Sequence, residues 1–221
     1  DKVAVITGGP GTGKTTLVRG LVQILERKGA RLALAAPTGR AAKRLSEATG
    51  QPAKTIHRLL EYNPANHGFN RRRENPIEAD CLVVDEVSML DIELASSLLE
   101  AVPPGCRLVL VGDSDQLPSV GPGNVLADLI ASGRVPVVRL DEVFRQAGGS
   151  LIVVNAHRVN AGLMPRLEPE VERVDFFFIP RDDPAEAAEL AVDLAARRLP
   201  QRYGFDPVTD IQVQPPFNRG D

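Results

Sequence analysis

The stretch VAVITGGPGTGKTTLVRGLV, residues 3–22, decides the fold. It begins with four apolar residues, passes through a glycine-rich loop, and ends with apolar residues at helical spacing. A buried strand, a tight loop and the start of a helix therefore follow one another directly. Glycine suits this loop because the backbone must adopt positive φ angles and approach another group closely.

The loop has the spacing of a phosphate-binding loop, with four residues between Gly8 and the run Gly13-Lys14-Thr15. In such loops, backbone N–H groups and a helix N-terminus surround the phosphates of a nucleotide. We expect Lys14 to reach the β and γ phosphates of ATP and the Thr15 hydroxyl to help hold Mg²⁺. The full set of expected nucleotide contacts is Gly9, Pro10, Gly11, Thr12, Gly13, Lys14, Thr15 and Thr16. A glycine turn without a ligand is the alternative, and the flanking strand and helix argue against it.

Composition narrows the class of protein. The chain has 221 residues, of which 43% are hydrophobic and 25% are charged, and its apolar runs are too short to cross a bilayer. A net charge of −3 means that any contact with nucleic acid requires a local basic surface. Cys81 and Cys106 each begin an apolar run and are expected to be reduced core thiols, so we expect a cytoplasmic protein without membrane contact.

Apolar strands that alternate with helical patterns predict an α/β fold with a doubly wound parallel sheet. The expected strands are residues 3–7, 31–36, 81–85, 107–111 and 136–140. The expected helices are residues 14–28, 38 or 39 to 48, 92–101, 124–132 and 150–161. In this fold ligands bind beyond the carboxyl ends of the strands, where the polar motifs of this chain also fall.

Three of these strand ends carry candidate catalytic residues. Asp85 is a candidate Mg²⁺ ligand, and Glu86 could orient or deprotonate the attacking water, although two acids could also merely cap a turn. Gln116 is placed to sense the γ-phosphate, with a simple turn as the alternative. Arg145 could stabilise charge on the transferring phosphoryl group, or it could pair with a neighbouring acid at 141 or 142.

Two segments carry concentrated positive charge. Thr38 is a natural N-cap for a helix that carries Arg40, Lys43 and Arg44, which is either a functional basic face or a solvated one. The polar insert at residues 62–76 has turn residues at its centre and predicts a short protruding hairpin. Its run of arginines at 71–73 suits phosphate contact, with a mobile surface loop as the alternative.

Six motifs in order resemble the RecD-type helicases of superfamily 1: GGPGTGKTT (8–16), APTGRAAKRL (36–45), TIHRLL (55–60), VDEVSMLD (84–91), VGDSDQLPSVGPG (111–123) and VFRQA (143–147). The resemblance implies an ATP-driven motor that moves 5′-to-3′ on single-stranded DNA and unwinds duplexes. It makes Lys14, Glu86, Gln116 and Arg145 the catalytic residues, and Thr15 with Asp85 the magnesium residues. It also implies DNA contacts at Thr38, Gly39, Arg40, Thr55 and His57, and it favours a strand-splitting hairpin that carries Arg71 and Arg72.

The resemblance further implies how the chain is divided. Residues 1–61 and 77–200 would form the first RecA-like motor domain, residues 62–76 the inserted hairpin, and residues 201–221 the start of a truncated second motor domain that opens with a strand at 210–214. Such a piece is expected to bind Mg-nucleotide weakly and to be poorly active alone. Expected partners are single-stranded DNA and its junctions with duplex, together with subunits of a recombination complex if the parent is an exodeoxyribonuclease V alpha subunit. A P-loop switch that uses ATP without moving along DNA is the rival hypothesis.

The last third of the chain is less informative. The phenylalanines at residues 176–178 are expected to fill core, and an alanine-rich helix is expected at residues 184–199. His157 and Arg158 lie within the expected helix at 150–161, and the sequence assigns them no role.

Overall fold

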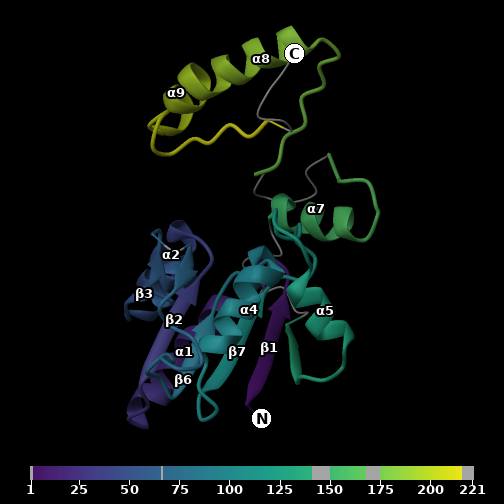
Figure 1. Ribbon diagram of the computed structural model, residues 1–221. Coiled ribbons are helices and arrows are strands. Elements are labelled where there is room, and N and C mark those ends of the chain that lie inside the picture. The colour runs from purple at the N-terminus through teal and green to yellow at the C-terminus, as the bar shows by residue number, and fades with distance from the viewer. Residues whose placement is uncertain (1, 66, 141–149, 168–174, 216–221) are drawn as a thin grey trace. The chain divides into compact units, whose positions relative to one another are not determined.

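The computed structural model describes residues 2–65, 67–140, 150–167 and 175–215 (Figure 1). The chain forms two compact units, residues 1–176 and residues 177–221, and each is described by itself. The first unit contains the phosphate-binding loop, the sheet and the inserted hairpin.

A six-stranded sheet organises the first unit. Its strands are β1 (Val3–Gly8), β2 (Leu32–Ala36), β3 (Ala53–Thr55), β6 (Cys81–Val84), β7 (Arg107–Gly112) and β8 (Val137–Leu140). They lie in the order β3-β2-β6-β7-β1-β8, and every pair is parallel. The predicted parallel α/β fold is therefore confirmed, and the five expected strands are all present. The sequence missed β3, because three residues without an apolar run give no strand signal.

Helices cover the sheet on both faces. They are α1 (Lys14–Arg27), α2 (Gly39–Thr49), α3 (Ile56–Leu59), the 3₁₀ turn η1 (Val87–Met89), α4 (Ile92–Ala101) and α5 (Val125–Ala131). Helix α7 (Leu151–Asn160) lies beyond the carboxyl ends of the strands (Figure 1). Side-chain caps start several of them: the Thr38 hydroxyl accepts from the N–H of Ala41, and the Asp91 carboxylate accepts from that of Leu94. The N-cap role predicted for Thr38 is confirmed.

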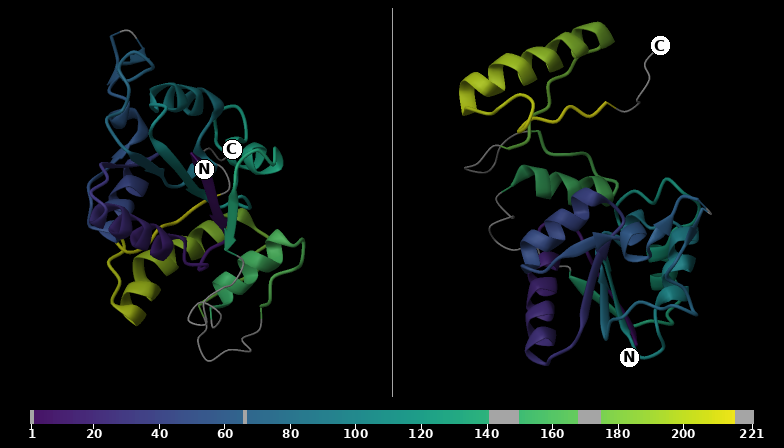
Figure 2. Two further views of the ribbon diagram at one scale, coloured as in Figure 1. Left: turned by 90° about the horizontal axis from the view of Figure 1, so that it is seen from below. Right: turned by 60° about the vertical axis from the view of Figure 1, so that its left-hand side comes forward.

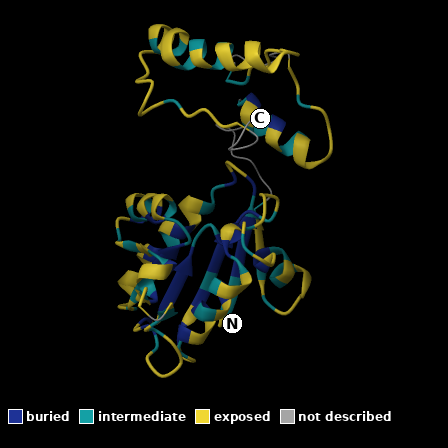
Figure 3. Cartoon of the chain, turned by 45° about the horizontal axis from the view of Figure 1, so that its top comes forward, coloured by how far each residue is buried: buried dark blue, intermediate teal, exposed yellow. Residues whose placement is uncertain are grey.

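Successive side chains of a strand point to opposite faces of the sheet, so the sheet separates two hydrophobic cores. Figure 3 shows the buried strands between the helices. In β6, Leu82 and Val84 face the core formed with α4 and α5, whereas Cys81 and Val83 face the core formed with α1 and α2. Because both faces are buried, the central strands are apolar throughout, as the sequence indicated. Cys81 and Cys106 are free and buried, as expected for core thiols, and burial raises the pKa of Cys81 to about 11.

The insert at residues 62–76 forms the predicted hairpin, which projects from the sheet in the left view of Figure 2. Its strands β4 (Tyr62–Asn63) and β5 (Gly68–Phe69) are antiparallel, with Tyr62 opposite Phe69. A bridge between Arg72 and Asn75 continues the turn structure toward the end of the insert.

The described part of the second unit, residues 177–215, contains one helical stretch, made of α8 (Pro184–Asp193), a π-helical segment η2 (Leu194–Arg198) and α9 (Leu199–Tyr203). Two predictions are wrong here. Residues 210–214 form no strand, since the described part of this unit has no other strand with which they could pair. Phe177 and Phe178 are exposed, because they lie in irregular chain and not on an element that packs against a core.

Among the described residues no helix is both long enough and apolar enough to cross a membrane. The predicted boundary of the motor domain at residue 200 stays a prediction.

Adjacent leucines in α4 offer a test of the packing. Leu98 is 1% exposed and Leu99 is 53% exposed. Replacing Leu98 by alanine should lower the free energy of unfolding by about 2–5 kcal/mol, because it opens a cavity under the sheet. Leu99→Ala, the matched control, should change it by less than about 1 kcal/mol. Urea denaturation measures both values, and similar losses for the two variants would contradict the assignment of faces.

Candidate nucleotide site and neighbouring surfaces

The phosphate-binding loop lies at the carboxyl end of β1 and depends on glycine at several positions. Gly11 and Gly13 have φ angles of 76° and 89°, which side chains with a Cβ atom rarely adopt. A Cβ atom on Gly8 would lie 2.6 Å from the carbonyl oxygen of Leu140 in β8, which is too close. The loop is therefore wedged against the neighbouring strand, and its path is fixed by backbone contacts.

Lys14 closes this loop. Its Nζ donates hydrogen bonds to the carbonyl oxygens of Gly8 at 2.5 Å and Gly9 at 2.9 Å, and the Thr12 hydroxyl also donates to the Gly9 carbonyl, at 2.8 Å. The first turn of α1 has no side-chain cap and no acidic residue. A helix N-terminus of this kind offers unpaired N–H groups and partial positive charge to an anion, so the loop fits a phosphate chain.

Asp85 and Glu86 follow β6 directly, and both are half-buried. The backbone N–H of Glu86 donates to Asp85 Oδ1 at 2.9 Å, and Glu86 adopts a left-handed conformation with φ of 56°. Burial raises the pKa of both carboxyls, and the charge of Lys14 partly counteracts this rise at each. The pair therefore lies close to the lysine, in a setting where a cation that compensates negative charge would be favoured.

These residues also fit a bound Mg²⁺. That ion commonly uses one or two carboxylates together with substrate phosphates and water, and does not need a complete protein cage. Asp85 at the end of β6 and the exposed Thr15 hydroxyl in the first turn of α1 are the donors of suitable type.

Gln116 is held by an acid in the loop after β7. Its Nε2 donates to Asp113 Oδ2 at 3.2 Å, and the backbone N–H of Asp115 donates to Asp113 Oδ1 at 3.1 Å. Ser114 joins this loop to β1, because its N–H donates to the Thr7 hydroxyl at 3.2 Å. Asp113, which the sequence treated only as a turn residue, is buried and fixes the position of the Gln116 amide.

The structure also shows interactions of two residues near the site, Arg44 and His157, that the sequence did not predict. The charge of Arg44, on α2, lowers the pKa of Glu86 against the effect of burial. His157, on α7, contacts Gly9 of the loop. Arg145, the predicted transition-state arginine, lies outside the described residues, and its role stays a prediction.

The predicted DNA contacts at Thr38 and Thr55 come from neighbouring strand ends, since β2 and β3 pair with Ala36 opposite Thr55. Each hydroxyl caps the helix that follows, and Thr55 accepts from the N–H of Arg58 at 3.2 Å. Gly39 begins α2, and Arg40 follows it in the same first turn. The structure thus places these four residues at the carboxyl edge, while their contact with DNA stays a prediction.

His57 belongs to an aromatic cluster at the root of the hairpin. Its ring centroid is 5.8 Å from that of Tyr62 and 5.7 Å from that of Phe69, and the two aromatic rings of the hairpin are 5.4 Å apart. These spacings lie within the range of favourable edge-to-face packing. His57 therefore joins α3 to the hairpin, a role that its sequence position alone did not indicate.

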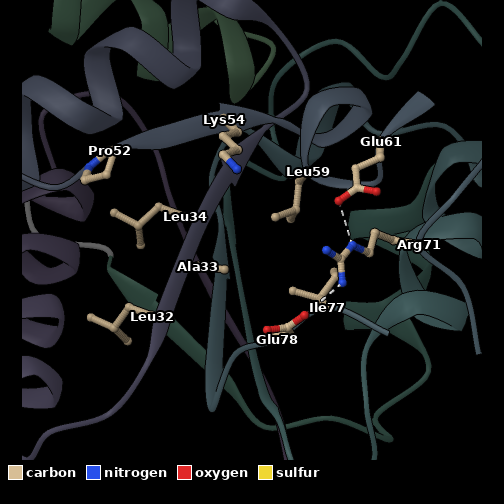
Figure 4. Close-up of a pocket in the computed structure, with 10 residues that line it drawn as sticks. All are labelled: Leu32, Ala33, Leu34, Pro52, Lys54, Leu59, Glu61, Arg71, Ile77 and Glu78. Carbon is tan, nitrogen blue, oxygen red and sulfur yellow. Dashed lines mark hydrogen bonds and ion pairs between the residues drawn. The ribbon is translucent and has the colours of Figure 1, made fainter. Parts of the chain in front are cut away.

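Arg71 is an internal clamp at the hairpin root, and its side chain is 22% exposed. Its Nε contacts Glu61 Oε1 at 2.8 Å, and its Nη1 contacts Glu78 Oε1 at 3.3 Å and the carbonyl oxygen of Pro76 at 3.0 Å. Figure 4 shows this arginine on the wall of a cavity of about 360 Å³. Its Nε and Nη1 atoms are engaged in these contacts, and its side chain is largely buried. The predicted DNA contact therefore fits Arg72 better, because its side chain is 66% exposed and pairs only with Glu74 among the described residues, at 3.3 Å.

The loop, the acid pair and the strand order agree with the family comparison. Residues 1–122, more than half of the chain, match the model of the AAA domain family. The chain belongs to this AAA domain family.

The chain has RecD-type relatives. It is 46% identical over 164 residues to the ATP-dependent RecD2 DNA helicase of Deinococcus radiodurans, a match that covers 74% of this chain and 22% of the relative. It is 39% identical over 226 residues to the RecBCD enzyme subunit RecD of Mycobacterium tuberculosis, covering 89% of this chain and 39% of the relative. The resemblance to RecD-type proteins is therefore confirmed, although the chain spans less than half the length of these relatives. A solved Pif1 helicase from Candida albicans is also similar, with a TM-score of 0.46 and 26% identity over 66% of this chain and 37% of that one.

The buried acids predict a pH dependence of stability. Because burial raises the pKa of Asp85 above its ordinary 3.8, the folded protein holds the proton over a range where the unfolded chain has lost it. The free energy of unfolding therefore falls as pH rises from the ordinary pKa through the raised one. Asp85→Asn should lose the share of this dependence that Asp85 contributes, while Glu86 keeps its own. Without nucleotide, the variant should be more stable than the wild type at neutral pH.

Urea unfolding at a series of pH values measures this effect. The exposed carboxylate Asp182, replaced by asparagine, is the matched control and should leave the pH profile unchanged. A lower stability of Asp85→Asn at neutral pH would show that burial does not determine the pKa of Asp85.

The Arg71 clamp predicts a local change in hydrogen exchange. Arg71→Ala should speed exchange at the N–H groups of Asn70 and Arg71 itself, which bond to the carbonyls of Glu61 and Leu60. We expect about a three- to tenfold increase, a modest value because the partner carboxylates are partly exposed. Arg72→Ala is the control, and an equal increase there would contradict the clamp.

Proposed function

We propose that this AAA domain is the first motor domain of an ATP-dependent DNA helicase of the RecD type, which couples hydrolysis to 5′-to-3′ movement on single-stranded DNA. The observation that carries the proposal is the charge arrangement around Lys14, whose ammonium binds the loop and also influences the acid pair at the end of β6. The relatives named as RecD2 helicase and RecD subunits support the choice of motor.

In this proposal the residues share the ATPase chemistry as follows. Lys14 exchanges the carbonyl oxygens of the loop for phosphate oxygens, and Thr15 with Asp85 holds Mg²⁺, which would neutralise charge on the phosphates. Glu86 orients and deprotonates the attacking water, for which its raised pKa makes it a stronger base. Arg145 is assigned to the developing negative charge.

Coupling to DNA follows from the strand order. Because β3, β2 and β6 are neighbours, the ends that carry Thr55, Thr38 and Asp85 are consecutive along one edge of the sheet. Arg44 extends this link, since it lies on the helix that Thr38 caps and its charge acts on Glu86. A strand bound at the first two ends could therefore shift α2 and alter the charge environment of the catalytic base.

The hairpin is proposed as the part that meets the duplex junction. Its root is held by the aromatic cluster and by the Arg71 clamp, so its tip would keep a defined position relative to α3. A wedge needs such support, because a loose loop would yield to the duplex instead of separating it.

A second arrangement has support from the same comparisons, because relatives named as RecD subunits of RecBCD enzymes include one from Mycolicibacterium smegmatis that is 47% identical over 152 residues. In that case the full-length protein would act within a complex. Size measurement of the native protein purified from its own cells separates the two arrangements, since a stand-alone helicase would elute without stoichiometric partners.

The motor proposal is tested by ATP hydrolysis in the full-length protein that contains this chain. We expect oligothymidine to stimulate turnover strongly and Lys14→Ala to abolish it, since losing one charged contact to the transferring group can cost about 10³-fold or more. Lys28→Ala, at the far end of α1, serves as the control for removing a lysine charge. Hydrolysis that is indifferent to DNA would favour the P-loop switch instead.

A further inference from the structure

His157 is the one histidine of the chain that contacts the phosphate-binding loop in the described structure. A Cβ atom placed on Gly9 would lie 2.9 Å from His157 Cε1 and 3.6 Å from its Nε2, so the ring lies directly against the backbone of the loop. The Nε2 atom is inaccessible to solvent and has no hydrogen-bond partner among the described residues. A buried polar atom without a partner costs free energy, so this placement calls for an explanation.

Helix α7 is anchored well enough to hold the ring there. Asn155, buried on this helix, donates from Nδ2 to the carbonyl oxygen of Arg166 at 2.9 Å and accepts from its N–H at 2.7 Å. The Arg158 guanidinium donates to the carbonyl oxygen of Met164 at 2.8 Å. The segment that follows α7 is therefore folded back on the helix by contacts on both sides of His157.

A cavity beside the ring connects it to the loop after β7, which carries Gln116. A cavity of about 180 Å³ is lined by Gly9 and Pro10 from the phosphate-binding loop, by His157 with Ala156 and Asn160 from α7, and by Asp113, Asp115 and Gln116 from the loop after β7. The charged groups on this cavity are the two aspartates. Both loops that would respond to a bound nucleotide thus meet α7 at His157.

The carbonyl oxygen of Gly9 could accept a hydrogen bond from His157 Nε2 after a nucleotide binds. It accepts from both Lys14 Nζ and Thr12 Oγ1 in the structure. When Lys14 turns to the phosphates of a nucleotide, this carbonyl loses one of its two donors. A carbonyl oxygen accepts two hydrogen bonds, so it can then take another N–H donor.

We propose that His157 is a positioning residue for the nucleotide site, whose Nε2–H donates to the Gly9 carbonyl once a nucleoside triphosphate has drawn Lys14 away. The inference rests on the proposed function, because it requires that Lys14 bind nucleotide phosphates. The new hydrogen bond would fasten α7 to the loop only in the nucleotide-bound state. Occupancy of the site would thereby be transmitted to α7 and to the chain folded back on it.

Imidazole NMR of the 221-residue chain tests the hydrogen bond directly. The chain has three histidines, so ¹⁵N-histidine labelling gives few signals, and His157→Gln assigns the relevant one. Addition of Mg²⁺ with a non-hydrolysable ATP analogue should move the Nε2–H proton of His157 downfield, while His67, at the hairpin, should not respond. An unchanged His157 signal at saturating analogue would overturn the proposal.

Binding affinities separate the hydrogen bond from simple packing. His157→Leu keeps bulk but removes the donor, and it should weaken binding of the analogue about three- to tenfold, the usual value of one hydrogen bond. His157→Gln keeps a donor at a similar distance and should restore most of the affinity. Wild-type affinity in the leucine variant, or equal losses in both variants, would contradict a hydrogen-bonding role.

Lys14→Ala distinguishes failure of this inference from failure of the proposed function. If the wild type binds no analogue, or if Lys14→Ala binds as well as the wild type, the proposed nucleotide site is wrong. If Lys14→Ala loses binding while the His157 variants match the wild type, only the inference about His157 is wrong.

Discussion

The ammonium group of Lys14 is the contact on which the carboxyl edge of the sheet depends. It ties together the carbonyl oxygens at the start of the phosphate-binding loop, and its charge offsets part of the cost of burying Asp85 and Glu86. The strand order makes this possible, since β1 and β6 are separated only by β7. A fold that brings carboxyl ends of parallel strands to one edge thus also brings a cation to two buried acids.

The same arrangement explains why the site stores free energy. Lys14 compensates both carboxyls and Arg44 compensates Glu86, yet both pKa values remain raised. Glu86 also adopts a left-handed conformation that non-glycine residues seldom occupy. Strained and incompletely compensated groups cluster where a protein binds or reacts. Mg²⁺ would supply the missing positive charge, and the phosphate chain would supply a new partner for Lys14. Ligand binding would therefore reduce the unfavourable free energy of burying the two carboxyls.

Local patterns predicted the parts of this structure that depend on neighbours in sequence. The apolar run of β6 requires burial on both faces, and the spacing from Gly8 to Lys14 requires a loop between a strand and a helix. Features that depend on distant segments were not predictable. The three arginines at 71–73 look alike in the sequence, and only the folded hairpin brings Glu61 and Glu78 to Arg71. His157 meets Gly9 across most of the motor unit, so no spacing rule could join them. The strand expected at 210–214 was wrong because a strand needs a neighbouring strand, and the described part of the second unit supplies none.

The central claim is that the edge around Lys14 is a site for a triphosphate together with a divalent cation. Isothermal titration of the 221-residue chain with a non-hydrolysable ATP analogue, in Mg²⁺ and again in excess chelator, tests it most directly. The account predicts binding that is at least about tenfold tighter with Mg²⁺, because the cation would offset the negative charge of both the phosphates and the half-buried carboxylate of Asp85. Binding of equal strength in the two conditions, or no binding in either, would contradict it.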